Sequence, residues 1–313
     1  MESLMVAMRV VYPLMIYMLI GWFIRKRGIM DKEHFKTVNA TVFKVILPIG
    51  IFFDIYKTDI GEVFQPQIFL FVFIGIIVLF SLSWIVVSRV VKENRDATVV
   101  IQGIYRSNYA LFGASIAKTV CDAEGIALVA ALTAIVVPTI NVLAVILFEV
   151  KRGGNIKFSR VFMNILKNPL VVAGISGAIV ALLGIKIPEI ISQPFITFGN
   201  IAAPLALMAL GGMISAKSVI SHRKYLAIAV IGRLVFAPIL MLSSAILLGM
   251  RGDVLIALLA VFGSPTAISS APMAQAMGGN GELAGEIVAI TSVFSIISVF
   301  LLVFALSRFG FLV

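Results

Sequence analysis

Charged residues are scarce in this sequence. Asp, Glu, Lys and Arg make up 13% of 313 residues, whereas a soluble domain has about 25%. Hydrophobic residues reach 61%, and the mean hydropathy is +1.11. A chain with so little polar surface cannot cover itself in water, which excludes an ordinary soluble fold. The length leaves room for about ten spans of about 20 residues each, so an all-α integral membrane protein is predicted.

Residues that hold metals and disulfides are also few. Cys121 is the one cysteine, which excludes an internal disulfide framework, and His34 and His222 both fall in charged connections. The sequence has no P-loop, zinc motif or paired aspartate-rich motif, which disfavours an ATP-driven pump or an intramembrane enzyme. No catalytic residue, metal site or cofactor is predicted. The net charge of +10 is divided among the connections, so nucleic acid is not an expected partner.

Ten apolar segments remain when the chain is divided at charges and at Gly/Pro clusters. They are 4–24, 35–56, 68–91, 97–120, 124–148, 169–186, 195–217, 223–249, 253–278 and 282–307. The first segment has no Lys or Arg before residue 9, and Arg25, Lys26 and Arg27 follow it. This charge order is typical of a retained span whose amino end is outside, not of a signal peptide.

The distribution of basic residues predicts the orientation. Connections after the odd-numbered spans carry sixteen Lys and Arg, and the other connections together with the tail carry five. By the positive-inside rule, both termini lie outside the cell membrane and the basic loop 149–168 is cytoplasmic. Contact with lipid headgroups is the expected role of these basic loops.

The two halves of the chain resemble each other at an offset of 156 residues, without a gap. The matched pairs are Pro13 and Pro169, Leu14 and Leu170, Gly21 and Gly177, Gly28 and Gly184, Ile29 and Ile185, Glu33 and Glu189, Thr41 and Thr197, and Pro48 and Pro204. Five spans per half is an odd number, so the halves enter the membrane from opposite sides. We therefore predict a first repeat at 1–150, a short basic loop at 151–168 and a second, inverted repeat at 169–313.

Two of the segments have polar centres. The fourth contains Arg106-Ser107-Asn108-Tyr109 followed by Gly113, and the ninth runs from Gly263 to Pro272 with prolines at 265 and 272. The offset of 156 places Asn108 on Ser264, so the two interruptions occupy matching positions. Proline removes a helical hydrogen bond, and the freed backbone groups need partners inside the bilayer. The alternative interpretation is two kinked helices whose polar residues only repair the backbone.

Ionisable residues inside the spans indicate the sign of the substrate. Lys44, Asp54, Arg106 and Arg233 lie well inside predicted spans, and three of the four are positive. Such residues usually face a cavity or a partner. Arg106 is placed to hold a carboxylate, or else to pair with freed carbonyls or with Asp54. A structural pair is expected for Arg233 and snorkelling for Lys44; with Asp54 they are candidate gates or charge partners.

The residues from Arg106 to Gly113 resemble the pattern of the auxin efflux carrier family, which includes plant PIN proteins and bacterial malonate and malate permeases. Asn168-Pro169-Leu170, Ala203-Pro204-Leu205 and the prolines at 265 and 272 agree with that pattern. The resemblance covers nearly the whole chain. It departs from the plant proteins in its short central loop, and it has Ser107 where the family has a proline before the asparagine.

The resemblance implies a fold like that of the bile-acid sodium symporters. Broken helices four and nine would cross, and Asn108 would be the crossover asparagine of the substrate site. Spans 1, 2, 6 and 7 would form a scaffold, often dimeric, and the other spans a mobile domain that alternates access. The predicted helix breaks are Asn108, Gly113, Pro265 and Pro272.

Together these features predict a secondary transporter or facilitator of a small carboxylate such as malonate, malate or an auxin-like acid. The expected substrate site consists of Arg106, Ser107, Asn108, Tyr109, Ser264, Pro265, Thr266 and Ser269. Two alternatives stay open: a sodium-coupled symporter resembling the bile-acid carriers, and a membrane sensor that binds a ligand without moving it.

Overall fold

The computed structural model describes residues 2–57, 65–109, 121, 123–152, 163, 165–214 and 216–312, with the side chains of 12–57 and 218–312 included at its two ends. The predicted break at Gly113 and most of the loop 149–168 lie outside the described residues. Within them, the regular elements are all helices. This confirms the predicted all-α class.

The helices follow the expected apolar segments closely. Their bounds are α1 Glu2–Lys26, α2 Lys32–Thr41, η1 Val42–Ile46, α3 Leu47–Tyr56, α4 Pro66–Val90, α5 Asn94–Tyr105, α7 Ala123–Lys151, α9 Pro169–Leu182, α10 Glu189–Asn200, α11 Ala202–Met213, α12 Ala216–Ser221, α13 Arg223–Ile231, η2 Gly232–Phe236, α14 Ala237–Leu247, α15 Asp253–Gly263, α16 Ser270–Met277 and α17 Gly281–Arg308. Six of the described helices are long and apolar enough to cross a membrane: Lys32–Tyr56, Pro66–Val90, Ala123–Lys151, Glu189–Met213, Arg223–Leu247 and Gly281–Arg308.

Capping residues explain several of the helix starts. Asn168 precedes α9, and its side chain accepts hydrogen bonds from the amides of Leu170 and Val171, while Pro169 occupies the first position, where no amide is needed. Asp31 caps α2 in the same way by accepting from Glu33 and His34. The bond from the His34 backbone amide is the main reason that the pKa of the Asp31 carboxyl lies below its ordinary value.

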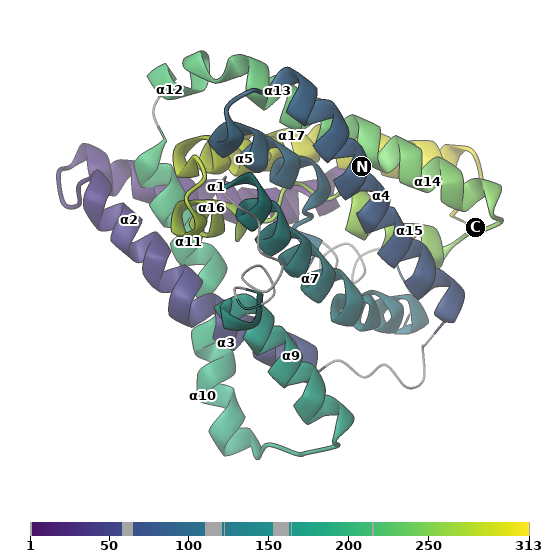
Figure 1. The fold of residues 1–313 in the computed structure, drawn as a ribbon. Coiled ribbons are helices and arrows are strands. Elements are labelled where there is room, and N and C mark those ends of the chain that lie inside the picture. The colour runs from purple at the N-terminus through teal and green to yellow at the C-terminus, as the bar shows by residue number, and fades with distance from the viewer. Residues whose placement is uncertain are drawn as a thin grey trace.

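The helices pack in two groups (Figure 1). In one group α1 runs along α11, and α3 packs against α9 and α10. The other group contains α4, α5, α7 and the helices from α13 to α17. Each group takes helices from both 1–150 and 169–313, so the two halves of the sequence are interleaved in space. The candidate site lies where the groups meet.

Glycines allow α1 and α11 to approach each other very closely. A Cβ atom on Gly21 would lie 1.8 Å from the carbonyl oxygen of Met208, and one on Gly211 would lie 1.9 Å from that of Met18. Both distances are impossible for real atoms, so only glycine fits at either position. Small residues at helix contacts are a common means of packing inside a bilayer, where lipid tails compete with apolar side chains.

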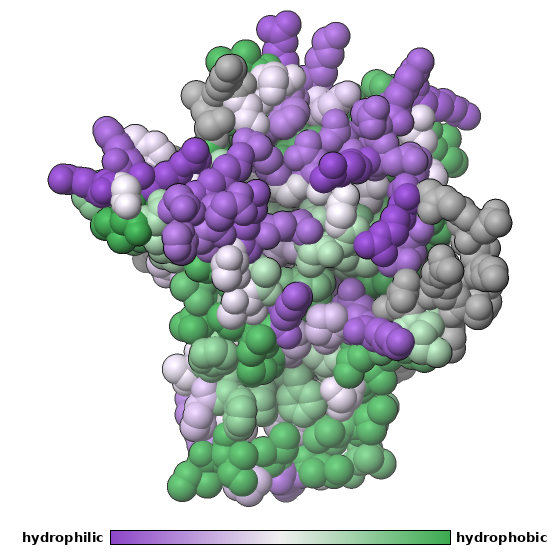
Figure 2. Space-filling view, turned by 60° about the vertical axis from the view of Figure 1, so that its left-hand side comes forward, coloured by the Kyte–Doolittle hydropathy of each residue, from purple (hydrophilic) through white to green (hydrophobic). Residues whose placement is uncertain are grey.

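The surface is divided between polar and apolar regions (Figure 2). Hydrophilic side chains gather over one end of the visible face, and a broad hydrophobic region covers the other. The most exposed apolar side chains include Ile190 at 85% and Leu182 at 83%, at the ends of α10 and α9. A soluble monomer rarely exposes apolar patches of this extent, and the lipid bilayer is the natural environment for them.

The close approach of α1 and α11 can be tested with a single methyl group. We expect Gly211→Ala to destabilise the protein by about 1–3 kcal/mol, because the new atom forces two helix backbones apart. Thermal unfolding in detergent, followed by fluorescence-detected size exclusion, measures the change.

Gly174→Ala is the matched control. Its Cβ would meet the Ile55 side chain at 3.5 Å, which is an ordinary contact, so we expect little change in melting temperature. Equal melting temperatures for both variants would show that the α1–α11 contact is not as tight as described.

Candidate functional site

Two helices stop in the middle of the molecule, and their ends are bonded to each other. Helix α5 ends at Tyr105, and α15 ends at Gly263, seven residues before α16 begins. Ser107 and Thr266 form an antiparallel bridge. Asn108 N donates to the Pro265 carbonyl at 2.8 Å, and Ala267 N donates to the Arg106 carbonyl at 3.2 Å. We call the paired segments 106–108 and 264–267 the junction.

Hydroxyl groups complete the backbone bonding of the junction. Thr266 Oγ1 donates to the Gly103 carbonyl at 2.7 Å, and Thr266 N donates to Thr291 Oγ1 at 3.3 Å. Thr266 and Ser264 are buried, with exposures of 1% and 0%. The freed backbone groups therefore find partners within the protein, as the cost of leaving them unpaired requires.

Arg233 lies at the centre of this bonding. The π-helix η2 carries it from span 223–247 towards the junction, and the side chain is 0% exposed. Its Nε donates to the Ser264 carbonyl at 2.7 Å and its Nη2 to the Val261 carbonyl at 2.8 Å. Its Nη1 donates to the carbonyls of Ile104 and Tyr105 at 3.2 and 3.4 Å. One guanidinium thus binds the open carboxyl ends of both α5 and α15, where freed carbonyls gather.

Arg106 is buried within a second polar network. Its Nη1 donates to Gln102 Oε1 at 2.7 Å and contacts Met273 Sδ at 3.0 Å. Its Nη2 donates to Asn141 Oδ1 at 2.8 Å and to Ser269 Oγ at 2.9 Å. Helices α5, α7 and α16, with the segment before α16, are joined through this side chain. The four groups that contact the guanidinium are neutral, so none of them offsets its positive charge.

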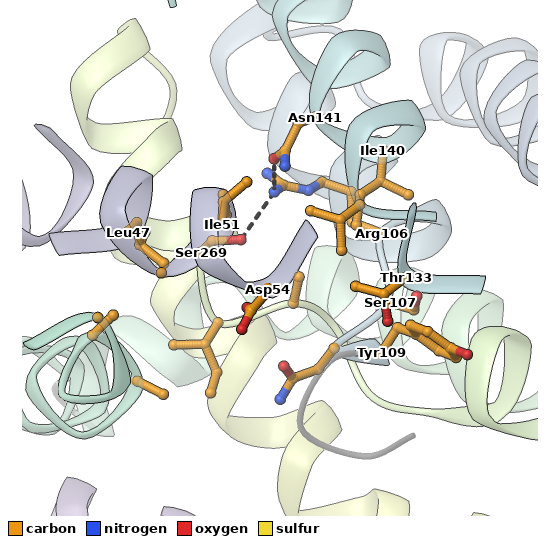
Figure 3. Close-up of a pocket in the computed structure, with 18 of the residues that line it drawn as sticks. Leu47, Ile51, Asp54, Arg106, Ser107, Tyr109, Thr133, Ile140, Asn141 and Ser269 are labelled. Carbon is orange, nitrogen blue, oxygen red and sulfur yellow. Dashed lines mark hydrogen bonds between the residues drawn. The ribbon is translucent and has the colours of Figure 1, made fainter. Parts of the chain in front are cut away.

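A cavity of about 460 Å³ opens beside the junction. Figure 3 shows Arg106 reaching Asn141 and Ser269 on one side, while Asp54 projects from α3 across from Ser107. The wall is formed by α3, α7, the α10–α11 region and the junction. Its lining residues are Leu47, Gly50, Ile51, Asp54, Lys57, Arg106, Ser107, Asn108, Tyr109, Ala130, Thr133, Val137, Ile140, Asn141, Gly199, Asn200, Ala202, Ala203, Ala267, Ile268 and Ser269.

Two buried donors at this wall lack a hydrogen-bond partner. Arg106 Nε and Asn108 Nδ2 are both shielded from solvent and have no acceptor among the described residues. A buried donor without a partner costs roughly 1–3 kcal/mol, so such atoms usually indicate a ligand or water position. Tyr109, by contrast, donates its hydroxyl to the Val129 carbonyl and contributes its ring to the wall.

The predicted site residues separate into two sets. Arg106, Ser107, Asn108, Tyr109, Ser269 and the predicted gate Asp54 line the cavity. Behind the cavity lie three residues of the junction, Ser264, Pro265 and Thr266. Arg233 also lies there; we call it the clamp, because it binds the ends of both α5 and α15. Sequence reasoning missed Asn141, Asn200, Thr133 and Lys57, which also line the wall. A lone asparagine inside the apolar span 123–151 was the available signal for Asn141.

Two further predicted positions lie away from the cavity. Lys44 is exposed on η1, as expected for a side chain that snorkels. Pro272 lies inside the first turn of α16 instead of at a break, because the helix has already restarted at Ser270 and first-turn amides need no helical acceptor. Among the described residues, no group of three or more His, Cys, Asp or Glu is placed to hold a metal ion.

Comparison with known proteins now decides the family. Residues 6–303 match the family described as "Membrane transport protein". The chain belongs to this family. The predicted relationship to the auxin efflux carriers is thereby confirmed. The chain is also similar to "Uncharacterized transporter MJ1031" of Methanocaldococcus jannaschii, with 26% identity over 309 residues that cover 94% of this chain and 96% of the relative. Family and apolar helices together make it a multi-pass membrane transport protein.

The Arg233 clamp predicts a large loss of stability on substitution. We expect Arg233→Met to destabilise the protein by several kcal/mol, because each buried carbonyl left without a donor costs roughly 1–3 kcal/mol. Arg233→Lys should recover part of the loss, since an ammonium cannot reach four carbonyls at once. Yield and melting temperature in detergent report both effects.

Lys44→Met serves as the control for the clamp. Lys44 is likewise a basic residue in a π-helix, but it is exposed, so its replacement should leave stability nearly unchanged. A stable, well-expressed Arg233→Met protein would contradict the role given to the clamp.

Proposed function

We propose that the protein carries a small organic anion across the membrane and binds it in the cavity beside the junction. The observation that supports this most directly is the pair of unpartnered donors, Arg106 Nε and Asn108 Nδ2, at one wall. A carboxylate offers acceptors and a negative charge, and a cationic donor binds it more strongly than a neutral one. A cavity of about 460 Å³ has the size expected for a small-molecule site.

The residues of the proposed site have different roles in binding. Arg106 supplies charge and one donor. Its Nη1 is already bonded to Gln102 and its Nη2 to Asn141 and Ser269, so the guanidinium is held in place before the ligand arrives. Asn108 supplies a neutral donor. The Ser264–Thr266 segment sets the geometry of the junction without touching the anion. A preorganised site of this kind spends little free energy on ordering side chains during binding.

We further propose ten spans in two inverted five-helix repeats, whose broken fourth and ninth spans cross at the junction. The described helices support this: one helix of each half, α5 and α15, ends at the junction, and the segments that follow them are bonded antiparallel. Alternating access would move the α1–α3, α9–α11 group against the other group. The first group presents exposed apolar faces on α9 and α10, which suit a homodimer contact or lipid.

Orientation follows the basic residues. We place both termini outside the cell membrane and the loop 149–168 in the cytoplasm. Arg25 at the end of α1 donates to the Gly212 carbonyl near the end of α11, and Lys151 at the end of α7 donates to Ser88 Oγ near the end of α4. With this orientation Lys57, which lines the cavity, lies at the outer end of span Lys32–Tyr56.

Transport can be tested in proteoliposomes with radiolabelled small carboxylates. We expect Arg106→Ala and Asn108→Ala each to abolish saturable uptake. Arg106→Lys should retain a small part of the uptake, because the positive charge remains but the forked set of guanidinium donors is lost. Asn108→Asp should be at least as damaging as Asn108→Ala, since it replaces a donor by a second negative charge. Unchanged kinetics in Arg106→Ala and Asn108→Ala would rule out this site.

Arg251→Ala controls for loss of a positive charge. Arg251 is exposed, donates to the carbonyls of Ile246 and Met250, and lies over the Phe311 ring. It does not line the cavity, so its loss should not change uptake. The same assay separates the competing functions. Uptake that requires sodium would favour a sodium symporter, and tight binding without flux would favour a sensor.

Ligand binding offers an independent measurement. A carboxylate that occupies the cavity should raise the melting temperature of the wild-type protein, because a ligand at 100 times its Kd adds about 2.7 kcal/mol of stability. Arg106→Ala should show no such rise. A rise of equal size in both proteins would place the ligand elsewhere.

A further inference from the structure

A second polar cluster lies near the start of span Lys32–Tyr56, whereas Lys57, just after the end of that span, lines the cavity. Glu286 of α17 is fully buried, and its Oε2 lies 2.8 Å from Nδ1 of His222, whose side chain is 20% exposed. Ser218 Oγ of α12 lies 3.4 Å from the same imidazole nitrogen. None of these residues lines the cavity. The proposed anion site therefore makes no use of this buried acid.

The bonding of Glu286 is incomplete. Its Oε1 atom is buried and has no hydrogen-bond partner in the described part of the chain, while Oε2 contacts the imidazole. A carboxylate in such a position needs either a positive charge beside it or a proton on itself. A proton shared between Glu286 and His222 satisfies this need in either location. Histidine is the side chain whose charge ordinarily changes between about pH 5 and pH 8.

The cluster adjoins a contact that joins the two helix groups. One turn before Glu286, Glu282 Oε2 pairs with Lys32 Nζ of α2 at 2.9 Å. Next to it, Gln275 Nε2 of α16 donates to the Lys36 carbonyl at 2.9 Å, and Asn39 Nδ2 donates to Gln275 Oε1 at 3.3 Å. We call these bonds between α2 and the α16–α17 region the closing contact. Separation of α2 from the α16–α17 region breaks these bonds.

Other described ionisable groups near these helix ends are bonded elsewhere or exposed. Arg25 of α1 donates to the Gly212 carbonyl, Asp96 of α5 accepts from Asn280, and Arg95 donates to the Gly278 carbonyl. Arg223 and Lys224 of α13 are exposed. Among the residues described, Glu282 with Lys32 is the ion pair nearest in sequence to Glu286.

We propose that His222 and Glu286 form a proton-binding site that controls the closing contact. With the proton bound, the pair is neutral or an ion pair, and the end of α17 packs against its neighbours. Without the proton, a carboxylate is buried with no positive charge against it, which favours entry of water and separation of α17 from α2. The closing contact is then stable at low pH and weakens as pH rises. Its meaning for transport rests on the proposed function, but proton binding itself does not.

The proton site can be observed directly, because the chain has only two histidines. NMR titration of histidine-labelled protein in nanodiscs gives two resonances, and His222→Gln assigns them. We expect Glu286→Gln to lower the proton affinity of His222 by about tenfold or more, the effect of removing an adjacent opposite charge. His34, exposed and bonded to Asp31, should titrate unchanged in that variant and serves as the internal control.

Glu282→Gln is the matched comparison, since it removes a carboxylate one turn away on the same helix. The proposal requires a smaller shift of His222 in Glu282→Gln than in Glu286→Gln. An equal or larger shift, or a His222 resonance that does not titrate, overturns it. Arg106→Ala should leave the His222 titration unchanged, so a failure of the anion site and a failure of the proton site give different results.

Control of the closing contact is measured by thiol labelling. In a Cys121→Ser background, Asn39→Cys reports the closing contact, and Thr37→Cys on the exposed side of α2 corrects for the intrinsic pH dependence of maleimide chemistry. We expect the Asn39/Thr37 rate ratio to rise severalfold from about pH 5.5 to about pH 8, the interval of histidine titration. In Glu286→Gln the ratio should stay constant. A constant ratio in the unsubstituted background would overturn the control of closure.

Discussion

The binding of Arg233 to four backbone carbonyls is the interaction on which the centre of this protein depends. A helix that stops inside a bilayer leaves carbonyl groups with no water to bond, at a cost of several kcal/mol. Two such ends meet here, and one guanidinium has enough donors for both. The positive charge also suits the negative ends of two helix dipoles. An apolar side chain at this position would leave the interruption too costly to keep.

The freed backbone groups of the junction are bonded on the side away from the cavity, so its side facing the cavity remains available for other contacts. Thr266, Arg233 and the backbone pairing take up the freed groups, whereas Arg106 and Asn108 keep donors that nothing within the described protein uses. The break is therefore more than a kink repaired by polar residues, although repair is part of it. Under the proposed function, the structural and ligand-binding roles fall on different residues, so the residues proposed to bind the anion can vary without collapse of the fold.

Local sequence features predicted much of this arrangement and missed what depends on distant contacts. The two polar interruptions and the apolar segments follow from residues close in sequence. The offset of 156 residues and the family resemblance are what placed Arg106 and Asn108 at one site with Ser269, 163 residues from Arg106. Arg233 carries no neighbouring motif, because its partners lie about 30 and 130 residues away. Thr266 has the same hydroxyl whether it binds a ligand or Gly103, so its role could not be assigned. The pair of Glu286 and His222 was not predicted. Glu286 lies near the start of its span and His222 in a connection, and only the fold brings them together.

The glycine contact between α1 and α11 has a mechanical consequence. Two backbones in direct contact have no side chains between them that could change rotamer, so the helices cannot slide past each other or twist apart by small steps. We expect α1 and α11 to move together as one rigid body. Movement between the two helix groups must then occur at the interfaces that α17 and α7 form, where contacts are made by longer side chains that can repack.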